Sequence, residues 1–290
     1  MKERLKNERI KELETKREQR MLEALKKWRK LLPNWSNIRD HNMIKLWEIG
    51  LPPKVRGSIW MLVLKSGESI EFKALVQSAL QILENQKNHS TAGIERKYVH
   101  DVKSLEIDIA KTLPELNLFQ VSCPMYDDLK EVLLATALSL INYGYKAGMA
   151  NLAAMFLLNM NKECAFECLC RLFERNFFQI IHSSDADKNI PDLYSAFMAL
   201  ELHENTLVSM YTTLFPLEIS SRIWDCVFLY GEVYLFKAAL GYLKLIKPKI
   251  LNQSLEWIMP MLKKSLAIEE NQLFEKINSI RIDDDAFCGF

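Results

Sequence analysis

The segment IERKYVHDVKSLEIDIAKTLPEL (94–116) indicates most clearly how this chain folds. Its apolar residues recur at intervals of four, four, three and four, as one face of an α-helix requires: Ile94, Tyr98, Val102, Leu105 and Ile109. Lys111 follows this stripe, and Asp108 stands three residues before it. A lysine near a helix end complements the exposed carbonyls there, and Asp108 is an ordinary surface partner for it. On this segment alone, Lys111 is interpreted as a solvated surface lysine.

Helical signals continue along most of the chain. Gly and Pro number only nine each, which argues against many short strands joined by turns. The segment PLEISSRIWDCVFLYG (216–231) is typical of a helix, with Pro near its start and Gly231 at its end. Other helices are expected at 2–32, 52–64, 69–84, 94–111, 126–142, 146–159, 162–178, 191–202, 204–213 and 232–247, the last one ending at Pro248. The sequence therefore predicts an all-α, multi-helix fold of about a dozen helices.

The N-terminal segment differs in charge from the rest. Residues 1–30 hold twelve Lys and Arg but also six Asp and Glu, although the whole chain has a net charge of only +1. Such interspersed charges favour a solvated helix over an arm that binds nucleic acid, so no nucleic-acid partner is expected. We expect residues 1–20 to project from the domain, while the end of this helix docks through residues such as Trp28.

Cysteine usage and hydropathy predict an intracellular protein. The six cysteines have neither the spacing of a disulfide framework nor nearby histidines to complete a zinc site, so they are expected to be reduced. The start MKERLKNERIK has no apolar core of a secretory signal. The apolar run ANLAAMFLL (150–158) is too short to span a bilayer. The expected location is cytoplasmic, without direct membrane insertion, and recruitment to endomembranes would go through a partner.

Several catalytic classes lack their motifs. No GxxxxGK[ST], GxGxxG, GxSxG or HExxH pattern is present, and the five histidines are scattered without metal-ligand spacing. The sequence therefore predicts no metal site, no cofactor and no self-contained catalytic centre.

The order of five segments resembles the TBC domain, the domain of GTPase-activating proteins for Rab GTPases. These segments are LWEIGLPPKVRGSIW (46–60), LEIDIAKTLPEL (105–116), NYGYKAGMANLAAMFLL (142–158), ECAFECL (163–169) and SSRIWDCVFLYGEVYLFKAALGYLKL (220–245). The resemblance implies a charged helical extension over 1–34, a TBC-like domain over 35–280 and an acidic tail over 281–290. It also implies a GTP-bound Rab-family GTPase as the partner.

Two motifs carry the activity that this resemblance implies. TBC domains typically have an IxxDxxR motif whose arginine enters the GTPase site, and a YxQG motif whose glutamine positions the attacking water. The first motif here has Leu105, Asp108 and Lys111, and the second reads Tyr145, Lys146, Ala147 and Gly148. The resemblance therefore implies that Lys111 holds the arginine-finger position and Ala147 the glutamine-finger position.

Both departures remove chemistry that the reaction needs. A guanidinium meets the charge on two phosphoryl oxygens, and an arginine finger accelerates hydrolysis about 10³–10⁵-fold. Lysine is a point charge without that fork, and alanine cannot orient water. We therefore expect a Rab-binding regulator of membrane traffic with weakened or lost GTPase activation. Two alternatives stay open: an active GTPase-activating protein that uses Lys111 with the GTPase's own glutamine, and a scaffold that no longer binds Rab.

Further residues follow from the same resemblance. Arg56, Tyr145 and Gly148 are expected to face the Rab, and bracing of the finger region is an equal alternative for Arg56. Trp60 is expected in the core. Arg222 and Asp225, three apart on a helix, are expected to form a structural ion pair with each other. Thr206 and Glu167 stand where tryptophan is common in the family, which marks a divergent member.

Overall fold

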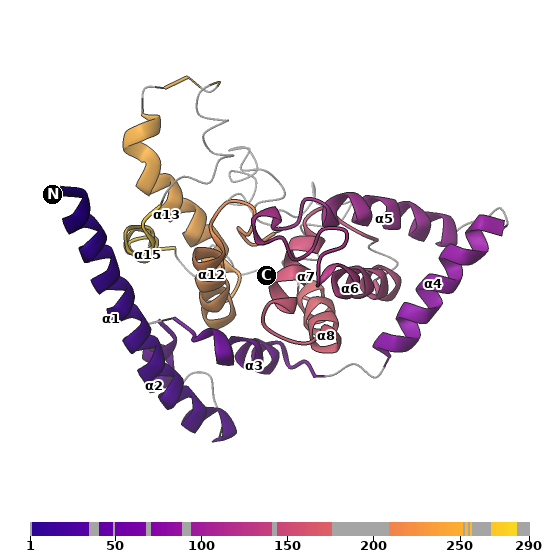
Figure 1. The fold of residues 1–290 in the computed structure, drawn as a ribbon, viewed down its shortest axis with the longest axis horizontal. Helices are drawn as coiled ribbons and strands as arrows, with labels where there is room; N and C mark the ends of the chain where they lie inside the picture. Colours follow the sequence, from indigo (N-terminus) through magenta and orange to yellow (C-terminus); the bar gives the residue numbers. More distant parts are fainter. Residues whose placement is uncertain are drawn as a thin grey trace.

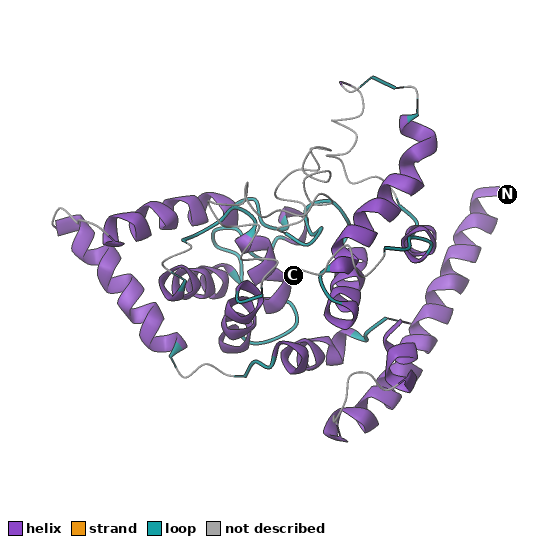
Figure 2. Cartoon of the chain, turned by 180° about the vertical axis from the view of Figure 1, so that it is seen from behind, coloured by secondary structure: helices purple, strands orange, loops and turns teal. Residues whose placement is uncertain are grey.

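The chain is described here by a computed structural model that covers residues 2–34, 41–48, 50–67, 71–88, 94–140, 144–175, 209–251, 253–254, 256 and 268–282. These residues form α-helices, two short 3₁₀ turns and connecting loops, with no strand among them. The all-α prediction is confirmed (Figures 1 and 2).

The described α-helices follow the chain in this order: α1 (Lys2–Leu31), α2 (His41–Glu48), α3 (Pro53–Leu64), α4 (Phe72–Asn88), α5 (Ile94–Ile109), α6 (Tyr126–Ser139), α7 (Met149–Leu157), α8 (Lys162–Phe173), α12 (Leu217–Tyr230), α13 (Val233–Ile250) and α15 (Glu270–Asn278). The 3₁₀ turns are η1 (Leu32–Asn34) and η2 (Pro114–Leu116). The N-terminal extension lies at one edge of the molecule, and α4 and α5 form the opposite edge (Figure 1).

Turn and cap residues set several helix ends. Pro216 precedes α12 and Gly231 ends it with a φ of 86°, as the sequence predicted. The side chain of Asn161 accepts a hydrogen bond of 2.9 Å from the backbone N–H of Cys164, which caps the start of α8. These local signals explain why the expected and observed helix bounds agree within a few residues.

Two helix predictions are wrong in the described part of the chain. Helix α13 does not end before Pro248 but continues to Ile250, because a proline two residues before a helix end removes only one backbone hydrogen bond. Residues 209–214 form successive turns instead of the end of a helix over 204–213. Left-handed backbone at Met210 (φ 46°) and Tyr211 (φ 69°) prevents a helix there. The helix predicted over 191–202 lies outside the described residues.

The core is built around helix α7. Eight of its nine residues are buried, so α7 is apolar on all sides and lies among other helices, chiefly α6 and α8. Trp60 of α3 and Trp224 of α12 pack with Phe156 of α7, with ring centroids 5.3–6.0 Å apart. Trp60 is fully buried, which confirms its predicted place in the core.

The end of α1 docks on this core. Ala24 is 3% exposed and Trp28 is fully buried, and the Trp28 ring meets the Trp47 ring edge-on at 5.8 Å between centroids. Residues 18–20 are exposed, and α1 runs along the outer edge of the molecule (Figure 1). The expected docking of the C-terminal part of this helix is confirmed.

A buried carboxylate joins α12 to α2 and α3. Asp225 accepts hydrogen bonds from Arg56 Nε (3.1 Å), Trp60 Nε1 (3.0 Å) and the backbone N–H of Leu51 (3.3 Å), and its carbonyl accepts one from Trp47 Nε1 (2.8 Å). Burial raises the pKa of Asp225, while the Arg56 guanidinium and the other donors oppose that rise.

The expected pair between Arg222 and Asp225 is therefore wrong. Asp225 bonds Arg56, and Arg222 bonds Glu270 of α15 at 2.9 Å. Asp225 points into the core, whereas Arg222 lies over the Phe274 ring of α15, 4.0 Å from its centroid. Both residues form structural ion pairs, but each pair joins two different helices.

The buried cysteines are free thiols. Cys168, Cys170 and Cys226 are buried, and burial raises the pKa of each thiol to about 12. They therefore stay protonated at neutral pH and behave as small apolar side chains.

Candidate functional site

The loop that carries Lys111 begins where α5 ends. The backbone N–H of Lys111 donates to the carbonyl of Asp108 at 3.0 Å, and the hydroxyl of Thr112 donates to the same carbonyl at 2.8 Å. Leu113 then adopts a left-handed conformation (φ 41°), and Pro114 opens the turn η2. The helix therefore ends sharply and leaves the Lys111 side chain exposed at its end.

A brace from further along the chain holds this loop. Gln120 Nε2 donates a hydrogen bond of 2.8 Å to the carbonyl of Thr112, next to Lys111. Thr112 itself is fully buried. The backbone around Lys111 is thus fixed from both sides, while its side chain stays free to contact a partner.

The loop that carries Ala147 lies between α6 and α7. The backbone N–H of Tyr145 donates to Asp101 Oδ2 of α5 at 3.1 Å. Gly144 (φ 72°) must be glycine, because a Cβ there would stand 2.7 Å from the same Asp101 oxygen. Gly148 (φ 95°) caps the start of α7, and Ala147 just before it is exposed.

One hydrogen bond brings the two loops together. The hydroxyl of Tyr145 donates to Asp108 Oδ2 at 3.0 Å. Burial, followed by the nearby Asp108 carboxylate, raises the pKa of Tyr145 well above its usual value, so this hydroxyl stays protonated and keeps its role as donor. Lys111 lies three residues after one end of this bond and Ala147 two residues after the other, so both exposed side chains belong to one surface region.

Lys111 places an exposed positive charge in this region. In the part of the chain that the structure describes, it forms no ion pair. The described residues also contain no group of three His, Cys, Asp or Glu arranged to hold a metal ion. Such a region offers a positive charge to a partner.

The other predicted site residues lie apart from these loops. Arg56 bonds Asp225 and the carbonyl of Leu51 (2.9 Å), near the C-terminal end of α7, whereas Gly148 starts that helix. Its predicted contact with a Rab stays a prediction. Glu167 forms a surface ion pair with Arg171 on α8 at 3.0 Å. Thr206 lies outside the described residues.

Sequence reasoning missed two residues that shape the site. Asp101 stands seven residues before Asp108, a spacing that places both carboxylates on one helix face toward the second loop. That spacing was a usable signal. No sequence signal pointed to Gln120, because its hydrogen bond to the Thr112 carbonyl spans a loop with no regular period.

The helical fold is that of a known family. A model of the Rab-GTPase-TBC domain matches residues 53–251, more than half of the chain, so the chain belongs to that family. Two solved structures share the fold. The Ypt/Rab-GAP domain of Gyp1p has a TM-score of 0.63 at 14% identity, covering 92% of this chain and 98% of that one. The flagellar RabGAP TBC domain of Chlamydomonas has a TM-score of 0.62 at 19% identity, covering 92% and 93%.

Sequence relatives agree with this family. TBC1 domain family member 12 of Rattus norvegicus is 27% identical over an alignment of 314 positions, which covers 98% of this chain and 45% of that protein. Drainin of Dictyostelium discoideum is 30% identical over an alignment of 335 positions, which covers 92% of this chain and 76% of Drainin. The chain thus spans about half the length of the first of these relatives. Within the described residues, no helix combines the length and apolar character that crossing a bilayer requires.

Proposed function

We propose that this TBC domain binds a GTP-bound Rab-family GTPase through the loops of Lys111 and Ala147, and that its ability to activate GTP hydrolysis is weakened or lost. The observation that carries the proposal is the hydrogen bond between Tyr145 and Asp108, which keeps the two loops side by side. The proposal includes a cytoplasmic site of action and a TBC domain over 35–280, between the helical extension (1–34) and the acidic tail (281–290).

In this proposal Lys111 stands at the arginine-finger position. Its ammonium attracts the phosphates of the nucleotide, but it meets one oxygen at a time and lacks the planar fork of a guanidinium. An arginine finger contributes about 10³–10⁵-fold, roughly 4–7 kcal/mol of barrier, of which a point charge recovers only part.

Ala147 stands at the glutamine-finger position. Its methyl group neither donates nor accepts a hydrogen bond, so it leaves the attacking water unoriented. Gly148 and Tyr145 keep the shape of the loop, through the left-handed cap and the bonds to Asp101 and Asp108. The proposal is therefore a domain that retains the surface for binding and lacks two groups for the chemical step.

One observation favours a second candidate function. Because Lys111 is exposed and without an ion-pair partner in the described residues, its charge is available to a bound nucleotide. If the GTPase supplied its own glutamine, the domain would be an active GTPase-activating protein.

The test is a panel of purified Rabs, each loaded with GTP or with GDP. Binding that requires GTP, together with little acceleration of hydrolysis, supports the proposal. GTP-dependent binding with strong acceleration supports the second candidate. A domain that binds no Rab in either state would contradict both and leave a scaffold role.

A further inference from the structure

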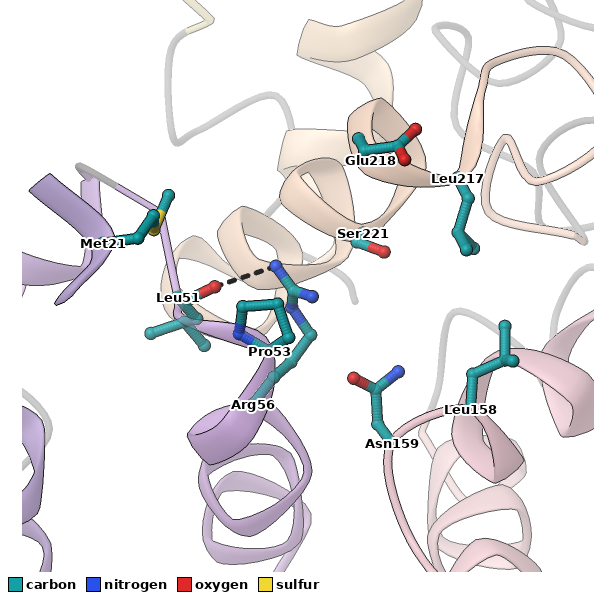
Figure 3. Close-up of a pocket in the computed structure, with 9 residues that line it drawn as sticks. All are labelled: Met21, Leu51, Pro53, Arg56, Leu158, Asn159, Leu217, Glu218 and Ser221. Atoms are coloured by element: carbon teal, nitrogen blue, oxygen red, sulfur yellow. Dashed lines mark hydrogen bonds between the residues drawn. The ribbon is translucent and has the colours of Figure 1, made fainter. Parts of the chain in front are cut away.

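A pocket of about 320 Å³ lies away from the two loops, between α1, α3, α7 and α12 (Figure 3). It includes Leu158 and Asn159, which directly follow α7, whereas Gly148 caps the start of that helix. Nine helical residues separate the two ends by about 13 Å. A ligand here would leave the Lys111 and Ala147 loops free.

Arg56 lines the pocket with a guanidinium that is held in place by hydrogen bonds. Arg56 uses Nε and Nη2 for Asp225 and the Leu51 carbonyl, and its Nη1 has no partner among the described residues. Figure 3 shows this end of the guanidinium facing the space bordered by Ser221, Leu217 and Asn159. The Arg56 side chain is 12% exposed, so this donor is both held in place and open to the pocket.

An acceptor stands beside this donor. Asn159 donates through Nδ2 to the carbonyl of Met155 at 2.9 Å, which leaves Oδ1 without a partner in the described residues. Its backbone is packed against α3, since a Cβ on Gly57 would lie 2.1 Å from the Asn159 carbonyl. The pair of Nη1 and Oδ1 matches a group with one carbonyl and one N–H, which is a peptide amide.

The charges around the pocket favour a neutral amide over a carboxylate as the bound group. The charge of Arg56 is balanced by the buried Asp225, and the exposed Glu218 stands on the rim. Glu218 has no ion pair within the described residues. An anionic ligand would therefore meet an excess of negative charge, whereas a neutral amide next to a basic side chain would not.

The walls of the pocket are apolar. Leu158 and Leu217 are each partly exposed, and their side chains point toward one another across the opening (Figure 3). Met21 and Pro53 line the other side. The space suits one aliphatic side chain, whose burial supplies most of the affinity.

We infer that this pocket binds a short peptide segment of a partner protein that carries a leucine-like residue followed by a lysine or arginine. The amide carbonyl accepts from Arg56 Nη1, the aliphatic side chain lies between Leu158 and Leu217, and the basic side chain meets Glu218. The inference does not depend on the proposed GTPase, because the pocket and the loops lie at opposite ends of α7.

The test uses the full chain with ¹³C-labelled Met and Leu methyl groups, and acetyl-Leu-Lys-amide as the probe. We expect saturable shifts of the Met21, Leu158 and Leu217 methyl resonances. Acetyl-Leu-Glu-amide should bind about fivefold more weakly, the scale of one exposed charge interaction. Glu218→Lys should invert this preference, while Glu84→Lys, a charge reversal on the exposed face of α4, should leave it unchanged.

Three outcomes would overturn the inference. The first is the absence of saturable shifts at these three methyl groups. The second is equal affinity for both peptides irrespective of residue 218. The third is tighter binding of acetyl-Leu-Lys with a free carboxylate, which would make the pocket an anion site.

Discussion

Two buried tyrosine hydroxyls differ in whether they have a hydrogen-bond partner. The hydroxyl of Tyr145 has a carboxylate partner, Asp108, at 3.0 Å. The hydroxyl of Tyr242 is buried without a partner among the described residues. A buried polar group that is paired contributes to stability, and one that is unpaired costs free energy. The same substitution should therefore have opposite effects at the two sites.

We expect Tyr145→Phe to lower the free energy of unfolding by about 1.5–3 kcal/mol, because it removes a hydrogen bond to a charged group. Tyr242→Phe should leave the stability unchanged or raise it slightly. Urea denaturation followed by tryptophan fluorescence measures both. Equal losses for the two variants would show that the Tyr145–Asp108 bond does not join the loops as described.

Residue contacts were predictable from the sequence only where they are local. The i,i+3 spacing suggested that Arg222 pairs with Asp225, but Asp225 bonds Arg56, 169 residues away. The periodicity of apolar residues along a helix does not predict a contact between residues so far apart in the sequence. The position of Lys111 just beyond α5 was predictable, whereas the brace from Gln120 was not.

At the scale of elements, α3 is held between α7 and α12. Asp225 of α12 accepts from Trp60 and Arg56 of α3, and Gly57 of α3 lies against the carbonyl of Asn159 after α7. Both contacts leave no room for a changed side chain. They make α3 the sensitive element of the fold, and two substitutions test this.

Asp225→Asn should destabilise the fold by about 3–5 kcal/mol, the usual cost of leaving a buried charge without its partner, here Arg56. The matched control is Glu232→Gln. It removes the partner of Arg175, and both of those side chains are about one-quarter exposed. The control should cost less than about 1 kcal/mol. A similar small loss for Asp225→Asn would contradict the buried junction.

Gly57→Ala should also destabilise, although alanine ordinarily favours a helix by up to about 1 kcal/mol. The new Cβ would stand 2.1 Å from the Asn159 carbonyl, so α3 must move, at a cost of about 1–3 kcal/mol. Gly67→Ala has no atom within 4 Å of the new Cβ and should stay within about 0.5 kcal/mol of the wild type. If Gly57→Ala were stabilising, this close approach would be wrong.

Most helices of the described chain were predictable because their ends carry local signals. Pro216 and Gly231 bound α12 as expected. Pro248 misled because it lies in the last turn of α13, where the helix continues for two more residues despite the hydrogen bond that proline removes. The left-handed turn at Met210 and Tyr211 has no glycine to signal it. The hydroxyl of Tyr211 instead bonds the carbonyl of Leu235, a contact that holds the turn from outside its own segment.

At the scale of the whole molecule, helix α1 divides into two parts. Its end belongs to the core through Trp28, while residues 18–20 are exposed. Deleting residues 1–20 should therefore shift the melting temperature by less than about 2 °C, because little apolar area is lost. Trp28→Ala should lower it by several degrees. A large shift from the deletion would mean that the first part of α1 also packs on the domain.

The family assignment and the chemistry of the two loops together make the central claim. The chain has the Rab-GTPase-TBC domain, and we propose that Lys111 and Ala147 weaken its activation of GTP hydrolysis. If so, Lys111→Arg with Ala147→Gln should restore activity, and each change alone should restore less, since groups that act as a unit are not additive.

Single-turnover GTP hydrolysis, on a Rab that binds in its GTP-bound state, tests this most directly. The matched control is Lys73→Arg with Ala74→Gln, the same substitutions at exposed positions on α4. We predict that the wild type and the control accelerate hydrolysis far less than about 10³-fold, and that the variant with both loop substitutions rises toward that range. Acceleration of about 10³-fold or more by the wild type would contradict the account, and so would a double variant that binds the Rab and remains inert.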